Sequence, residues 1–175
     1  MSISGEIYRG GNQRTPEIHA WTSLCLGMKV RSFVELGIGS SYLLRREGVP
    51  GVTVDLLPDA SPWHIQGDSH DPATRDRVID LLGAMPDVVF IDADHEAAMV
   101  RLDFELWWPV AQFLVGFHDI LMPSVVPFWH DVRRCYPSLE IVARDPASAQ
   151  AWQVGSGSDG DLACGGIGVL FKEGA

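Results

Sequence analysis

Short apolar runs of strand length alternate with helical patterns along most of the chain, and this alternation restricts the fold more than any other feature. We expect seven strands, over residues 32–36, 52–55, 64–66, 87–91, 113–117, 139–143 and 167–171. Several of these runs are apolar throughout, as strands buried on both faces are. Strands separated by helices are typical of βαβ units. The pattern therefore predicts one α/β domain over residues 1–175, with a three-layer, doubly wound, mostly parallel sheet.

Local signals place helices between these strands. Asp71 and Pro72 predict an N-cap and a first helical residue, and Gly83 predicts the end of that helix. Further helices are expected over residues 96–108 and 125–136 from the spacing of their apolar residues. Ile18, Trp21 and Cys25 are expected to face the sheet, and Trp107, Trp108 and Trp129 are expected in the core. The apolar residues that share one side of the other helices are Val78, Ile79, Leu82, Met99, Leu102, Leu106, Val125, Trp129, Val132 and Tyr136.

Two segments lie outside this regular pattern. Residues 1–30 are expected to form an N-terminal helical segment, with a helix from Thr15 onward. Residues 146–166 are rich in Gly, Ser and Ala, which predicts a flexible loop between the last two strands. Since no extended cap precedes the first strand, a lid over a substrate would come from one of these segments or from another subunit.

Charge and composition argue against several classes of partner. A formal net charge of -10 disfavours capture of nucleic acid, which depends on clustered Lys and Arg. No segment has the apolar length of a membrane span, and the N-terminus lacks the pattern of a secretory signal, so we expect a cytoplasmic protein. Cys25, Cys135 and Cys164 are too few and too far apart for a disulfide framework or a zinc knuckle. We expect a small-molecule substrate, and assembly into a homo-oligomer stays open.

The sharpest local motif follows the first strand. Glu35 is followed by a turn of small residues with Gly37, Gly39 and Ser41. Glycines let the backbone approach a ligand and expose amides at a helix N-terminus, although such a turn also occurs without a ligand and in dinucleotide-dependent dehydrogenases. The second strand ends in Asp55, where a ribose diol lies in a doubly wound fold. The alternative for Asp55 is a turn or helix-cap carboxylate.

The third strand leads to a second group of candidates. Asp68 and Ser69 follow it at the edge where open α/β sheets bind ligands, and both can hydrogen bond to an adenine. Equally, they can cap the following helix. Trp63, in the loop before this strand, is a candidate for stacking.

Acidic and imidazole side chains follow the fourth and fifth strands. Asp92 and His95 come after the fourth strand, and His118 and Asp119 after the fifth. Two carboxylates and two imidazoles on neighbouring strand ends suit a divalent cation, a general base, or both. The alternative is that each one caps a helix or contacts water.

Together these residues resemble the class I S-adenosylmethionine-dependent methyltransferases, over roughly residues 30–172. The resemblance rests on residues 35–39 as the first motif, Asp55 as the ribose acid and residues 67–68 as the adenine-side motif. Residues 89–95, 103–107, 116–120 and 166–172 look like the subgroup that contains sugar and macrolide O-methyltransferases and cephalosporin-hydroxylase-like proteins. The fold implied is a Rossmann-like sheet of seven strands with an antiparallel C-terminal edge strand.

The resemblance implies S-adenosylmethionine as cofactor and His95 as the base that deprotonates a hydroxyl. A metal ion, Mg²⁺ or Mn²⁺, would be held by Asp92, His118 and Asp119. The residues implied to bind the cofactor are Glu35, Gly37, Gly39, Ser41, Asp55, Asp68, Ser69 and Asp92. Two positions depart from the family pattern: Ser41 replaces the usual third glycine, and His118 stands where an oxygen ligand is common, which Mg²⁺ prefers.

The function implied is methylation of a small-molecule or sugar hydroxyl. A nicotinamide-dependent oxidoreductase shares the glycine turn and the ribose acid, and a catalytically silent binding protein shares the fold, so both stay as alternatives. The loop between the last two strands, where an oxidoreductase would have a helix, favours the methyltransferase.

Overall fold

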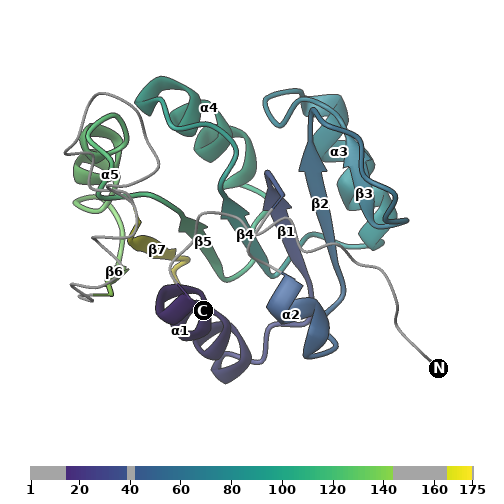
Figure 1. Cartoon of the computed structure of the whole chain (residues 1–175), viewed down its shortest axis with the longest axis horizontal. Helices are drawn as coiled ribbons and strands as arrows, with labels where there is room; N and C mark the ends of the chain where they lie inside the picture. Colours follow the sequence, from purple (N-terminus) through teal and green to yellow (C-terminus); the bar gives the residue numbers. More distant parts are fainter. Residues whose placement is uncertain (1–14, 39–41, 144–164, 175) are drawn as a thin grey trace, which may run out of the picture.

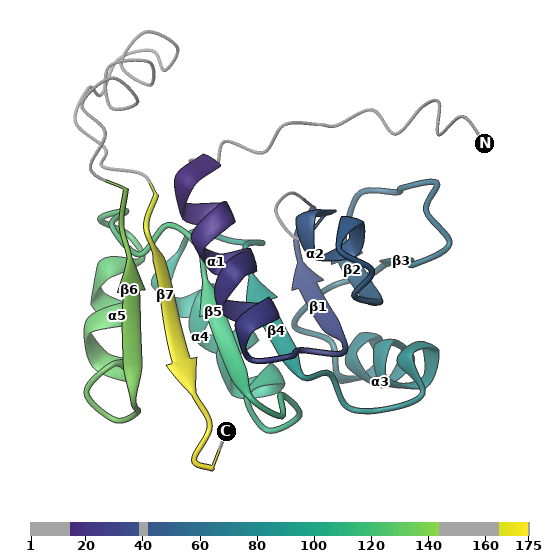
Figure 2. The same ribbon diagram turned by 90° about the horizontal axis from the view of Figure 1, so that it is seen from below.

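Seven strands form one sheet, and the described helices cover its two faces (Figure 1). The strands are β1 (Phe33–Leu36), β2 (Gly51–Asp55), β3 (His64–Gln66), β4 (Val88–Ile91), β5 (Leu114–Phe117), β6 (Ser138–Ile141) and β7 (Ile167–Phe171). Their order across the sheet is β3-β2-β1-β4-β5-β7-β6. β1 to β5 are parallel, whereas β7 is antiparallel to both of its neighbours, β5 and β6 (Figure 2). The predicted fold is confirmed, with β7 as the antiparallel strand and β6 outside it at the edge.

The computed structural model describes residues 15–38, 42–143 and 165–174. Gly39 and Ser41 of the glycine turn lie outside these described residues. So does the loop expected over residues 146–166, apart from its last two residues.

The helices form the outer two layers. α1 (Thr15–Gly27) and α2 (Tyr42–Arg46) cover one face, and α3 (Pro72–Leu82), α4 (Ala97–Trp107) and α5 (Val126–Val132) cover the other (Figure 1). Because successive side chains of a strand point to opposite faces, β1 contributes to both apolar cores. Phe33 lies in a cluster with Trp21 of α1, and Val34 lies in a cluster with Trp107 of α4.

Local chemistry explains the bounds of α3. Asp71 has extended backbone, and its side chain accepts a hydrogen bond from the Ala73 N–H at 2.9 Å, as an N-cap does. Pro72 follows at the first helical position. Gly83 ends the helix in the left-handed conformation, with φ of 71°. All three predictions are confirmed.

The buried side of α4 differs from the prediction. Met99 and Leu102 are 37% and 46% exposed, and Leu106 is only partly buried. The buried residues of this helix are Val100, Asp103, Phe104 and Trp107. The prediction was wrong because Asp103 occupies the buried side, so a carboxylate interrupts the apolar repeat from which the buried side was predicted.

α5 is shorter than the expected helix over residues 125–136. Its last α-helical residue is Val132, and the next turn closes through i→i−3 hydrogen bonds from Arg134 to Asp131 and from Cys135 to Val132. Such bonds tighten the end of a helix. Tyr136 still packs against the core, as predicted.

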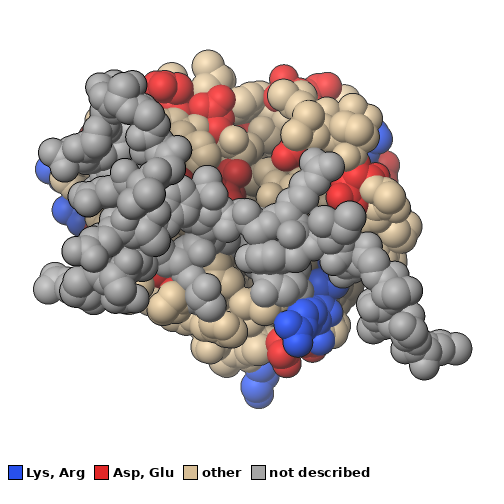
Figure 3. All heavy atoms as spheres, viewed as in Figure 1, with Lys and Arg blue, Asp and Glu red and all other residues tan. Residues whose placement is uncertain are grey.

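The charged side chains of described residues that are visible in Figure 3 do not form one broad basic patch. The Lys and Arg side chains in view lie in separate groups near the rim, and Asp and Glu side chains lie between them. Within the described residues, no helix is both long and apolar enough to cross a bilayer.

Candidate functional site

The strand order reverses direction beside β1. From β1 the chain moves outward through β2 to β3, and it then returns to the other side of β1 as β4. In open α/β sheets, the crevice at the carboxyl ends of the strands on either side of such a reversal is the usual ligand site. The predicted site residues that the structure describes lie at or just after the carboxyl ends of β1 to β5, so the topology brings them to this edge.

Gly37, which follows β1, packs against the backbone of Asp92 at the end of β4. Its φ is 87°, and its N–H donates to the Val54 carbonyl at 2.7 Å. A Cβ added at this position would lie 2.2 Å from the backbone oxygen of Asp92. Only glycine permits both the backbone conformation and this close approach. The turn after β1 is therefore held directly against the residue that follows β4.

Glu35 and Asp55 lie near the same edge with different surroundings. Glu35 is 2% exposed within β1, where its register neighbours are Thr53 and Phe90. Asp55 ends β2 and is half-buried, and its Oδ1 accepts a hydrogen bond from the Leu57 N–H at 2.7 Å. Asp55 thus makes the local turn contact that was its alternative role, at the position where a ribose is expected.

The residues after β3 divide between the surface and the interior. Asp68 is exposed, and its Oδ1 lies 3.1 Å from Nδ1 of His70. Ser69 is buried, and its backbone carbonyl accepts a hydrogen bond from Nε1 of Trp107 at 2.9 Å. Neither side chain caps α3, because Asp71 does so.

Asp103 of α4 is a functional candidate that the sequence analysis missed, having named it only within the motif over residues 103–107. Its side chain is fully buried, and Nε2 of His70 lies 3.5 Å from its Oδ1. Burial raises the pKa of Asp103 to about 6, although the nearby Ser69 and His70 side chains oppose this. Its local sequence gives little signal of this burial, because α4 also carries the charged Arg101 and Glu105.

Trp63 lies at the wrong end of its strand for the expected stacking. It directly precedes β3, and its surroundings include Pro50, at the amino end of β2. The ligand edge is at the carboxyl ends of these strands, so the structure does not support stacking of Trp63 on a base bound there.

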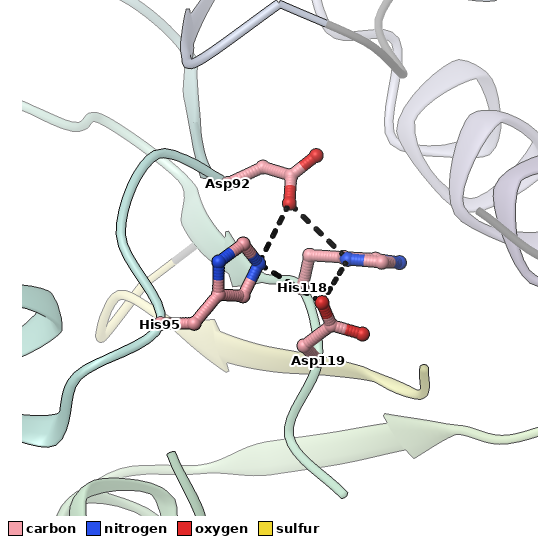
Figure 4. A group of neighbouring side chains, drawn as sticks. All are labelled: Asp92, His95, His118 and Asp119. Carbon is pink, nitrogen blue, oxygen red and sulfur yellow. Dashed lines mark ion pairs between the residues drawn. The ribbon is translucent and has the colours of Figure 1, made fainter. Parts of the chain in front are cut away.

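Asp92, His95, His118 and Asp119 come together at the ends of β4 and β5 (Figure 4). One possible ligand atom from each lies within 4.8 Å of all the others. Nδ1 of His118 is 3.2 Å from Oδ1 of Asp92 and 3.2 Å from Oδ2 of Asp119. Nε2 of His95 is 2.9 Å from Oδ2 of Asp119 and 3.9 Å from Oδ1 of Asp92. The convergence expected from the sequence is present, and we refer to these four residues as the acid–histidine cluster.

Burial distinguishes the two imidazoles of the cluster. The His118 side chain is 4% exposed, whereas that of His95 is 41% exposed. Burial disfavours a charged His118, yet the Asp92 and Asp119 carboxylates outweigh it and raise the pKa of His118 to about 10. The hydrogen bond to Asp119 also raises the pKa of His95 above its ordinary value, against the effect of partial burial.

Asp119 is held in an unusual backbone conformation. Its φ is 55°, which is uncommon for any residue other than glycine but tolerated by Asp. Its Oδ1 accepts the Gly165 N–H at 2.5 Å, so Oδ2 is the oxygen that faces the imidazoles. Burial would raise its pKa, but the nearby His118 and His95 imidazoles and the Gly165 N–H outweigh this and hold the pKa of Asp119 below its ordinary range.

Glu17 is a second residue that the sequence analysis missed. It lies in the first turn of α1 and is 1% exposed. Its Oε1 accepts the Ala143 N–H at 2.8 Å, and its Oε2 accepts the Gly166 N–H at 2.9 Å. Gly166 in turn accepts a hydrogen bond from the Ile120 N–H at 3.4 Å. Glu17 therefore supports the backbone beside Asp119, through a contact that spans most of the chain.

The donor atoms of the cluster do not match those that Mg²⁺ prefers. Mg²⁺ binds oxygen ligands in near-ideal octahedral geometry. Two of the four donors here are imidazole nitrogens, which suit Zn²⁺, Cu²⁺, Fe²⁺ and Ni²⁺. The cluster is thus chemically suited to a cation, but Mg²⁺ is not the ion that its residues favour.

No protein-family model matches the chain, and no curated protein matches it in sequence. Solved structures are similar in fold. The O-methyltransferase from Bacillus cereus, in complex with SAH, superposes with a TM-score of 0.57 at 13% identity, over 91% of this chain and 82% of that one. The O-methyltransferase TomG from Streptomyces achromogenes, in complex with SAM, gives 0.54 at 12% identity, over 91% and 81%.

A third similar structure is MycE, a methyltransferase of the mycinamycin biosynthetic pathway in complex with Mg and SAH. Its TM-score is 0.54 at 14% identity, over 94% of this chain and 54% of MycE. The chain therefore spans about half the length of MycE. At these identities the likeness establishes the fold.

Proposed function

We propose that the chain transfers the methyl group of S-adenosylmethionine to a hydroxyl of a small molecule. The observation that carries this proposal is the packing of Gly37 against the Asp92 backbone. Gly37, the first glycine of a turn that would suit a nucleotide-like cofactor, thus lies next to a residue of the acid–histidine cluster, which would suit proton transfer. The similar structures described above carry SAH or SAM, which supports the same cofactor here.

In this proposal the cofactor lies along the carboxyl ends of β1 to β4. Glu35, Gly37 and Asp55 would line the part nearest the glycine turn, and Asp68 would lie on the adenine side. The remaining residues proposed to bind it are Gly39, Ser41, Ser69 and Asp92. Ser69 would contribute through the backbone of its loop, since its side chain is buried.

His95 would act as the base. Nε2 contacts Asp119, so the lone pair of Nδ1 is the one left to accept a proton, and Figure 4 shows Nδ1 turned away from the other three residues. A carboxylate that orients an imidazole in this way fixes its tautomer. The acceptor oxygen attacks the methyl carbon as the bond from carbon to sulfur breaks. The sulfonium becomes a thioether, and the hydroxyl proton passes to His95. The protein mainly aligns the reactants.

The wider expectations from the sequence belong to the same proposal. We propose a single catalytic domain over residues 1–175, because every described helix packs on one sheet. We also propose a small-molecule acceptor and a cytoplasmic location. Assembly into a homo-oligomer stays a prediction.

Calorimetric titration with SAH and, separately, with NAD tests the proposal. We expect SAH to bind and NAD not to bind. Asp55→Ala should weaken SAH binding by about 1–3 kcal/mol, the cost of losing a hydrogen bond to a charged group. Asp80→Ala, at an exposed position of α3, is the matched control and should bind as the parent does. Binding of NAD alone would favour the oxidoreductase, and binding of neither would favour a silent protein of this fold.

A further inference from the structure

We propose that Asp92, His118 and Asp119 bind a divalent first-row transition ion, such as Mn²⁺, Fe²⁺, Co²⁺ or Zn²⁺, in preference to Mg²⁺. This inference deepens the proposed function, on which it rests for the role of the ion, because it names the class of cation at the same site. It stands on the geometry of three donor atoms and on the chemistry of one imidazole.

The distances from His118 to the two carboxylates match those between ligands of one ion. Nδ1 of His118 lies 3.2 Å from Oδ1 of Asp92 and 3.2 Å from Oδ2 of Asp119. Nitrogen and oxygen ligands lie about 2.0–2.2 Å from Zn²⁺, so two ligands at a tetrahedral or right angle are about 3.0–3.5 Å apart. Both distances from His118 fall within this range.

The His118 ring lies against two carboxylates but makes no well-aligned hydrogen bond to a described residue. Both ring nitrogens are buried, and neither has a hydrogen-bond partner of acceptable geometry among the described residues. Nδ1 is close to two carboxylate oxygens, but it is not aligned on either as a donor. A buried polar atom without a partner is costly, and a cation shared with the two carboxylates would satisfy this nitrogen.

The surrounding residues hold the donors in place. The Gly165 N–H binds the other oxygen of Asp119 at 2.5 Å, which turns Oδ2 toward His118. Nε2 of His95 also contacts Oδ2, at 2.9 Å, on the exposed side of the cluster. A carboxylate oxygen has two lone pairs, so Oδ2 can bind an ion and accept a hydrogen bond from His95 at the same time. His95 therefore need not be a ligand and can keep its role as base.

The nitrogen donor determines which ion is preferred. Imidazole suits Zn²⁺, Fe²⁺ and neighbouring transition ions, whereas Mg²⁺ demands oxygen ligands and gives up its water reluctantly. An aspartate in place of His118 would make the three protein donors all oxygen. His118 is thus the residue that we expect to set the ion preference.

The experiment uses the whole chain after chelator treatment, without cofactor or acceptor. Calorimetry should show one Mn²⁺ per chain, bound at least about tenfold more tightly than Mg²⁺. Pulsed electron paramagnetic resonance of bound Mn²⁺ should show coupling to a directly coordinated ¹⁴N. In His118→Asp the coupling should be lost and the preference for Mn²⁺ over Mg²⁺ should fall by about tenfold. His19→Asp, at an exposed position of α1, should change neither.

Mn²⁺ bound without nitrogen coupling would overturn the inference, as would equal affinity for Mg²⁺ or no binding of either ion. The coupling is measured on the unaltered chain, so the test stands even if His118→Asp does not fold. Because SAH binding is measured separately, a chain that binds SAH but no transition ion overturns this inference alone. A chain that binds the ion but not SAH overturns the proposed function and leaves the ion site.

Discussion

The buried Asp103 should make the stability of the protein fall as pH rises, and Asp103→Asn should remove this dependence. Asp103 is fully buried, and burial raises its pKa from 3.8 to about 6. The folded state therefore holds the proton more tightly than the unfolded state does. Stability linked to this proton is present below pH 3.8 and is lost progressively as pH rises through about 6.

The size of the effect follows from the shift. A shift of about 2 pKa units corresponds to about 3 kcal/mol between the two limits. Integrating the linkage between pH 5 and pH 7.5 gives somewhat less than half of this, or about 1 kcal/mol. The free energy of unfolding of Asp103→Asn, relative to that of the parent, should rise by that amount over this interval. Any change in stability that the substitution causes equally at both pH values does not affect this difference.

Urea unfolding followed by tryptophan fluorescence at the two pH values measures this difference. Asp80→Asn, exposed on α3, is the control and should show no pH-dependent gain. In a His70→Gln background the pKa of Asp103 should rise further, because the imidazole lowers it, and the difference should widen. The reasoning would be refuted if the stability of Asp103→Asn relative to the parent were the same at both pH values. It would also be refuted if this relative stability were lower at pH 7.5 than at pH 5.

Three further predictions concern the site. His95→Ala should slow methyl transfer by about 10²–10⁴-fold, the range for a general base, while SAH affinity is retained. The control His130→Ala, at an exposed position of α5, should leave the rate unchanged. Full activity of His95→Ala would remove His95 from the mechanism. Gly37→Ala should weaken SAH binding and lower the urea midpoint, because a Cβ would meet backbone 2.2 Å away; unchanged values for both would contradict the close packing. Glu17→Gln should lower the free energy of unfolding by about 1–3 kcal/mol, because an amide nitrogen cannot accept a hydrogen bond from the second backbone N–H. The control Glu47→Gln, at an exposed position, should change it very little.

The sequence by itself determined the features that depend on near neighbours in the chain. The cap at Asp71 and the end of α3 at Gly83 depend on a few adjacent residues, and both were predictable. The strands were predictable because their apolar runs have strand length and are separated by helical patterns. The convergence of Asp92, His95, His118 and Asp119 was also predictable, since all parallel strands of a doubly wound sheet end at one edge.

Only the tertiary structure decided the features that depend on distant contacts. Asp103 has the same local sequence signal as an exposed helical acid, and its burial comes from packing against the loop that carries His70. Glu17 resembles an ordinary acid in a first helical turn, yet its partners Ala143 and Gly166 lie more than a hundred residues away. Whether a carboxylate faces water or the interior is set by what the fold places beside it, because the cost of burial depends on partners that local sequence does not identify.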